Sequence, residues 1–95
     1  MLMTLNIDKD IPGHYTARFS DGSNLIGSTS HNRISEAIAE YGNNPPFADT
    51  IAFHVWYGGI SIGTIGIHEM KNKAEDLAQE LVRRSAAVHE AQDFA

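Results

Sequence analysis

The sequence predicts an α+β fold: a two-layer sandwich in which a mostly antiparallel sheet of four or five strands packs against two helices, in the order β-β-β-α-β-β-α. Three observations predict it. Apolar and polar residues alternate through the first part of the chain, as in strands with one buried face. The dipeptides Asp21-Gly22 and Gly58-Gly59 each separate two such segments, which is typical of β-hairpins. A helical period replaces the alternation from residue 34 and again from residue 69.

The first three strands are expected over residues 3–7, 14–20 and 23–29. Pro12-Gly13 indicates a turn between the first two strands, because both residue types favour turn conformations. Asp21-Gly22 then turns the second strand into the third. Alternation in the second strand predicts one apolar face, formed by Tyr15, Ala17 and Phe19.

The first helix is predicted by four apolar residues that recur at the spacing of one helix face: Ile34, Ala37, Ile38 and Tyr41. Ser30 and Asn32 are candidate N-caps. Gly42 stands where a residue in the left-handed conformation commonly ends a helix. Pro45-Pro46 prevents the helix from continuing, and Phe47 is expected to anchor the loop that follows.

Residues 50–67 are the most informative segment, because they read as a hairpin that carries the only tryptophan. A two-residue turn at Gly58-Gly59 places Phe53, Val55 and Tyr57 on one face, which suits the core. His54 and Trp56 then share the opposite face with small residues, as in a contact surface. Whether Trp56 lies in the core or at the surface stays open at this point.

The second strand of this hairpin changes phase, since Ile60 and Ile62 share one face whereas Ile65 and Ile67 share the other. A β-bulge corrects such a change, and the sequence offers three places for one: Gly63, Thr64 and Gly66. The alternative is a central strand that is buried on both faces. The bulge is the favoured interpretation.

The last element is expected to be one long helix over about residues 69–92. The predicted helix is longer than a neighbouring strand, so its part from Ser85 onward extends past the sheet. This part is expected either to fray or to pack against another molecule. Val88 and Ala91 are the candidate contacts for a homodimer. Residues 1–95 are expected to form a single domain, with fraying at about 90–95.

Composition excludes several classes of function. The chain has 7 basic and 12 acidic residues, so nonspecific binding to nucleic acids or anionic membranes is not expected, whereas a basic protein partner is. Cysteine is absent, which removes disulfides, thiolate nucleophiles and cysteine-based zinc sites. No apolar run is long enough to span a membrane, and no basic leader precedes the first strand. A cytoplasmic location is therefore expected.

The residue types that could carry catalysis do not form a recognisable constellation. None of the five histidines belongs to a motif with metal-ligand spacing, and no serine lies in a G-x-S-x-G context. Ser61 and His54 share the predicted face, but no acid is evident to orient the imidazole. The glycines at 58, 59 and 63 precede a strand instead of opening a helix, so they do not form a phosphate loop. No catalytic residue, metal or cofactor is predicted.

In outline, residues 3–41 resemble the HicB-type antitoxin domain. The shared features are a strand that ends near Asp8, the segment from Gly13 to Asp21, a return strand containing Gly27, and a helix containing Glu36-Ala37. The outline covers less than half of the chain and lacks the Leu-Pro-Gly-Cys-like segment that is usual between those strands. Nothing after Gly42 resembles the DNA-binding tail of that family, so the resemblance serves as an analogy only.

These observations favour a small, acidic, non-enzymatic binding or regulatory protein that recognises or inhibits a macromolecular partner, first of all a protein. An antitoxin or a phage-encoded inhibitor of a host complex that handles nucleic acids would be of this kind. Contact with the partner is expected from the hairpin residues His54, Trp56 and Tyr57. Steering of a basic partner is expected from four surface acids: Glu36, Glu40, Asp76 and Glu80.

Two other functions are weighed against this one. The first is a structural homo-oligomerisation module, built from the last helix or from the edge of the last strand. The second, which ranks last, is a small hydrolase or metal enzyme centred on His54, His68 and Glu69.

Overall fold

The computed structural model describes the main chain over residues 2–93 and the side chains over residues 2–88. Over this range the chain forms five strands and three helices: β1 (Leu2–Ile11), β2 (His14–Asp21), β3 (Asn24–His31), α1 (Ile34–Asn43), β4 (Ala52–Tyr57), β5 (Ile60–Gly66), α2 (Ile67–Asn72) and α3 (Ala74–Asp93).

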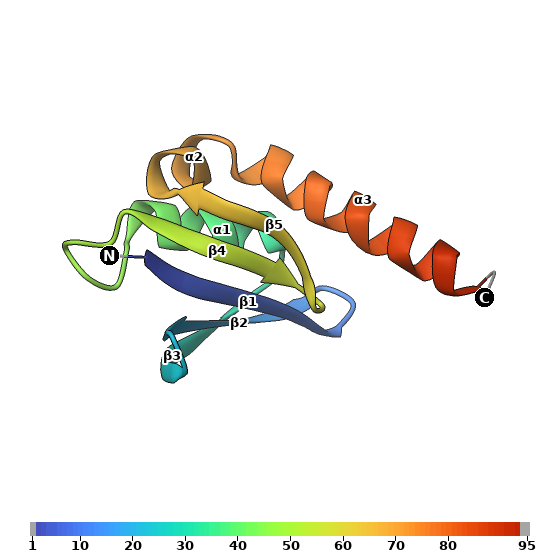
Figure 1. Cartoon of the computed structure of the whole chain (residues 1–95), viewed down its shortest axis with the longest axis horizontal. Helices are drawn as coiled ribbons and strands as arrows, with labels where there is room; N and C mark the ends of the chain where they lie inside the picture. Colours follow the sequence, from blue (N-terminus) through green and yellow to red (C-terminus); the bar gives the residue numbers. More distant parts are fainter. Residues whose placement is uncertain (1, 94–95) are drawn as a thin grey trace.

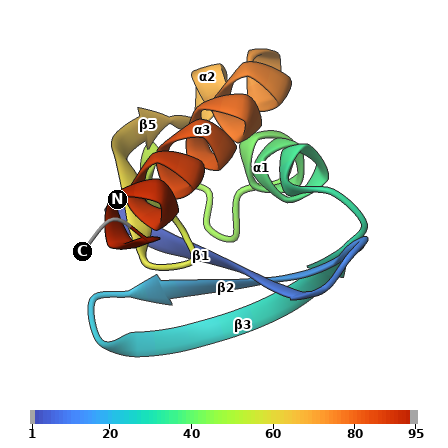
Figure 2. The ribbon, with the colours of Figure 1, turned by 90° about the vertical axis from the view of Figure 1, so that its right-hand side faces the viewer.

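The strands form one sheet in the order β3-β2-β1-β4-β5. Neighbours are antiparallel except β1 and β4, which run parallel because α1 carries the chain back to the end at which β1 starts. The three helices lie on one face of this sheet (Figure 1 and Figure 2). The predicted α+β class is therefore confirmed, with a mixed sheet and with three helices in place of two.

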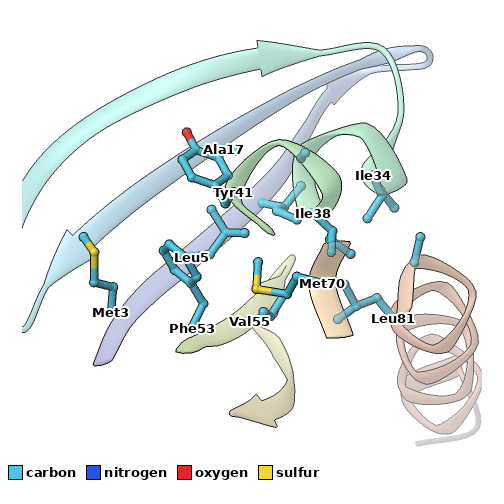
Figure 3. Close-up of a cluster of buried hydrophobic side chains, with 13 residues drawn as sticks. Met3, Leu5, Ala17, Ile34, Ile38, Tyr41, Phe53, Val55, Met70 and Leu81 are labelled. Atoms are coloured by element: carbon cyan, nitrogen blue, oxygen red, sulfur yellow. The ribbon is translucent and has the colours of Figure 1, made fainter. Parts of the chain in front are cut away.

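The core lies between the sheet and the helices. Alternate residues of the central strands point toward the helices and are buried, among them Leu5 of β1 and Phe53 of β4. Figure 3 shows these side chains directed at Ile38 of α1, Met70 of α2 and Leu81 of α3. The buried side chains of these central strands thus lie on one face, as the alternation predicted.

The β4–β5 hairpin contains the bulge that the phase of its isoleucines predicted. Trp56 lies opposite Ser61, but Val55 lies opposite Gly63, so Ile62 is the extra residue. Gly63 has a φ of +92°, a conformation that glycine adopts readily. His54 consequently pairs with Thr64. In a hairpin without the bulge, His54 would pair with Gly63.

The two ends of α1 differ from the prediction. Its N-cap residue is Arg33, which makes no side-chain capping bond, and the nearby main-chain N–H of Asn32 instead donates to the Glu36 carboxylate at 3.2 Å. Gly42 is not a left-handed terminal residue, because it lies inside the helix without a positive φ. It is buried against α2, where a Cβ atom would come within 2.5 Å of the Lys71 main-chain nitrogen.

The predicted last helix is divided in two at Lys73, whose φ and ψ of −126° and 29° interrupt the helical path. The Asn72 side-chain amide donates to the His68 carbonyl at 3.0 Å, and such a local bond competes with the helical main-chain pattern. The break lets α2 pack closely on α1 while α3 takes a different direction (Figure 1). The expectation for Phe47 was also wrong, since its side chain is 38% exposed and anchors no core.

Candidate functional site

The sheet face opposite the helices is covered by no other element in the part of the chain that the structure describes (Figure 2). We call it the open face. The strand register and the alternation of buried and exposed residues assign its side chains. The polar and aromatic ones are Thr4, Asn6, Asp8, Thr16, Arg18, Ser20, Ser28, Ser30, His54, Trp56, Ser61 and Thr64, and the apolar residues Leu2, Leu25 and Ala52 lie toward its margins.

Two aromatic rings meet on the open face. The centroids of the His54 and Trp56 rings are 5.0 Å apart and the ring planes are inclined by 34°. The two residues are two positions apart in β4, so both project to the same side of the strand. Both are half-buried, and Trp56 therefore lies at the surface of the sheet rather than in the core.

Ser61 on the neighbouring strand holds the imidazole in place. Its Oγ lies 2.7 Å from His54 Nε2 and also accepts a hydrogen bond from the Gly63 main-chain N–H at 2.8 Å. Because Oγ already accepts that bond, the hydroxyl hydrogen is available to donate to Nε2. The turn at Gly58-Gly59 places Ser61 opposite Trp56, and the bulge at Ile62 brings the Gly63 amide to the Ser61 hydroxyl.

We expect Ser61→Ala to reduce the free energy of unfolding by about 1 kcal/mol, because His54 Nε2 and the Gly63 N–H lose a shared partner. It should also change the fluorescence of Trp56, the only tryptophan, since the adjacent ring gains rotational freedom. Urea unfolding and the emission spectrum measure the two effects. Ser28→Ala is the matched control, because Ser28 is an exposed serine of the open face on β3. Equal behaviour of the two variants would contradict a role for Ser61 in orienting His54.

The residues beside the ring pair are polar and carry no net charge. The register places Asn6 and then Arg18 next to Trp56, while Thr4 lies next to His54. The Arg18 guanidinium is paired with the Asp8 carboxylate on the same face. The open face therefore offers hydrogen-bonding groups around an aromatic centre. The alternation in the first two strands already indicated that Asn6 and Arg18 belong to polar strand faces. Only the order of the strands in the sheet places these two residues beside Trp56.

Tyr57 does not join His54 and Trp56. It lies on the opposite face of β4, with its ring centroid 6.3 Å from that of Tyr15. Burial, and to a smaller extent Tyr15 and Asp8, raise the pKa of the Tyr57 hydroxyl, so the group stays protonated at neutral pH. The alternation of the strand already implied this separation, and the structure makes the aromatic centre a pair rather than a triplet.

The four predicted steering acids lie on the helical layer, away from the ring pair. Glu36 and Glu40 are exposed on α1, whereas Asp76 and Glu80 belong to α3. Glu80 forms ion pairs with Arg83 and Arg84, which offset its charge. These acids therefore contribute a negative electrostatic potential around the helices and do not line the open face.

The predicted dimer contacts lie on the last turns of α3. Val88 is 41% exposed, and this end of the helix projects beyond the sheet (Figure 1). The side chain of Ala91 lies outside the described residues.

The histidines whose side chains are described do not gather at one place. His54 is on the open face, whereas His68 lies in α2 and contacts the Asn72 side chain at 3.1 Å. In the part of the chain with described side chains, no three histidine or acidic residues stand close enough together to hold a metal ion. The Ser61–His54 pair has a serine and a base in contact, but the described residues show no acid hydrogen-bonded to His54. The Gly63 main-chain N–H donates to Ser61 itself.

A groove of about 430 Å³ lies between the start of α1 and the middle of α3. Ile34, Ala78 and Val82 give it an apolar lining, and Arg33 and Arg83 lie among its polar residues. It opens on the helical layer, so it is separate from the ring pair. No sequence motif pointed to it, because its two walls are forty residues apart in the chain.

None of the helices in the described residues has the length and the apolar run needed to cross a membrane. No family model, curated protein or solved structure matches the chain, and the outline shared with HicB-type antitoxins is thus not supported by a family match.

Proposed function

We propose that this chain is a non-enzymatic binding protein that recognises or inhibits a partner protein through its open face. The observation that carries the proposal is the ring pair of His54 and Trp56, in which His54 contacts the Ser61 hydroxyl and which no element of the described residues covers. Tryptophan is favoured at the centre of protein interfaces because it buries a large area at a small cost in side-chain entropy. A ring that is already held in place loses still less entropy on binding.

The surroundings of the ring pair also suit a protein partner. Hydroxyl and amide groups surround the rings, and a typical interface combines such a polar rim with an aromatic centre. The net charge of −5 favours encounters with a basic partner over long range, although the Arg18–Asp8 pair beside the rings is neutral. An antitoxin or a phage-encoded inhibitor of a host complex that handles nucleic acids remains the kind of protein that these properties suit.

Trp56→Ala should weaken partner binding by about thirtyfold or more, since a central tryptophan commonly contributes about 2 kcal/mol or more. Wild type and folded Trp56→Ala are compared by affinity capture from a lysate of the source cell, with mass spectrometry to identify the partner and titration to measure affinity. Val88→Ala is the control, because it truncates an exposed apolar residue on α3 and leaves the open face intact. A partner retained equally by Trp56→Ala would show that the open face is not the contact surface.

The structural alternative, a homo-oligomerisation module, is favoured by one observation, the exposed Val88 on the projecting end of α3. Light scattering separates it from the binding function. A monomer at high micromolar concentration would exclude it, whereas a dimer dissociated by Val88→Ala, together with an empty capture, would replace the proposal above.

A further inference from the structure

Strand β3 is an edge of the sheet with nothing on its outer side among the described residues (Figure 2). Six of its eight residues are exposed. An edge strand presents a row of unpaired N–H and C=O groups, and proteins commonly protect such edges with charged residues or proline. The segment from Asn24 to His31 contains neither Lys, Arg, Asp, Glu nor Pro.

The other edge, β5, is protected in several ways. Arg84 of α3 donates to the Ser61 carbonyl at 3.2 Å, and Ser61 Oγ accepts from the Gly63 main-chain N–H. The bulge at Ile62 further interrupts the strand. No described side chain makes a comparable hydrogen bond to the main chain of β3. Within the described residues, the edge at β3 is therefore less protected than the edge at β5 and better able to pair with a further strand.

The part of β3 that can accept a new strand is the segment from Gly27 to His31. Its pairing with β2 is regular, whereas Ile26 forms a bulge that disturbs the first part of the strand. Contacts on the helical side hold the segment: Thr29 Oγ1 lies 2.6 Å from the Tyr41 hydroxyl and 2.7 Å from His31 Nε2. A pre-ordered edge loses little entropy when it pairs.

Two acids of α1 lie beside this segment. The Glu36 carboxylate accepts a hydrogen bond from the N–H of Asn32, the residue that follows β3. Glu40 lies one helical turn after Glu36 and directly precedes Tyr41, whose hydroxyl is 2.6 Å from Thr29 Oγ1. The Glu40 carboxylate accepts a hydrogen bond from the Asn44 side-chain amide at 3.4 Å. Neither acid forms a salt bridge with a described Lys or Arg.

We propose that β3 binds an extended segment of a partner protein as a sixth strand, and that this segment carries Lys or Arg on the side that faces α1. Main-chain hydrogen bonds along residues 27–31 supply affinity, as in other cases of strand addition. Glu36 and Glu40 supply the preference for basic residues. The proposal concerns a surface distinct from the ring pair and does not depend on it.

A second copy of this chain is a poorer occupant of the same edge. Each copy carries a net charge of −5, so the approach of two copies edge to edge is opposed by repulsion between like charges. Charge complementarity therefore selects a basic partner strand.

The test uses the full chain and two synthetic peptides, acetyl-Thr-Lys-Thr-Val-Thr-Lys-Thr-amide and the same peptide with Glu in place of Lys. Amide NMR shifts and amide hydrogen exchange are recorded on titration. The lysine peptide should shift and protect the amides of residues 27–31, and the glutamate peptide should bind about tenfold more weakly. Glu36→Lys with Glu40→Lys should reverse the preference, whereas Glu75→Lys with Asp76→Lys, which changes the charge equally on α3, should leave it unchanged.

Three results would overturn the proposal. One is a set of shifts on His54 and Trp56 or on β5, with none at residues 27–31. Another is equal binding of the two peptides. The third is protection of residues 27–31 that increases with protein concentration in the absence of peptide, since this would identify a second copy as the occupant.

Discussion

Gly42→Ala is expected to destabilise the protein by about 3 kcal/mol, the upper part of the range for inserting a methyl group into a well-packed interior. The new Cβ would lie 2.5 Å from the Lys71 nitrogen and 2.8 Å from the Met70 carbonyl carbon, and both are main-chain atoms. A flexible side chain could move aside, but here α1 or α2 must shift as a whole. Urea unfolding followed by far-ultraviolet circular dichroism measures the change.

Gly66→Ala is the matched control for this prediction. A Cβ at Gly66 would meet only the Ile51 carbonyl oxygen, at 4.0 Å, which is ordinary contact. We expect its effect to stay below about 1 kcal/mol, as for most substitutions without a specific mechanism. If both variants unfolded at the wild-type urea concentration, the close approach of α1 and α2 would be disproved.

Phe53→Ala is expected to cost about 3–5 kcal/mol, which combines the lost transfer free energy of the ring with the cavity that it leaves. Phe53 is fully buried in β4, and its ring lies edge-on to Tyr41 at a centroid distance of 5.8 Å. The whole protein is expected to be stable by only about 5–14 kcal/mol, from about 0.05–0.15 kcal/mol per residue. The variant should therefore be close to unfolding at physiological temperature. Calorimetry measures this loss of stability.

Phe47→Ala provides the same chemical change at an exposed position of the loop before β4. We expect its free energy of unfolding to fall by no more than about 0.5 kcal/mol. A large effect at Phe47 combined with a small one at Phe53 would mean that the core is not arranged as in Figure 3.

The candidate site could be predicted in part. Strict alternation in β4 was sufficient to place His54 and Trp56 on one side and Tyr57 on the other, because the side-chain period of a strand is two. The same alternation and the two-residue turn placed Ser61 on the face of His54, although the hydrogen bond from the Gly63 N–H to Ser61 was not predicted. The neighbourhood of Asn6 and Arg18 was not predicted either, because it depends on the parallel pairing of strands that are about fifty residues apart.

Gly42 shows why other predictions failed. A glycine after an apolar helical stripe commonly marks the end of a helix, and nothing local distinguishes that role from close packing between two helices. The difference appears only when α2 is in place, because the atoms that exclude a side chain at Gly42 come from Met70 and Lys71. In the same way, one periodic apolar pattern ran through Asn72 and Lys73, where the chain breaks into two helices.

By itself, the sequence determined the α+β class, the hairpins and the apolar face of each strand, since these follow from local periodicity and from turn residues. Only the tertiary structure decided which faces and edges are left uncovered. The exposure of Trp56 depends on the helices lying on one side of the sheet. The difference between the two edges depends on Arg84 reaching β5, while no element within residues 2–93 covers the outer side of β3. Coverage is a property of packing between distant segments, and local sequence patterns do not contain it.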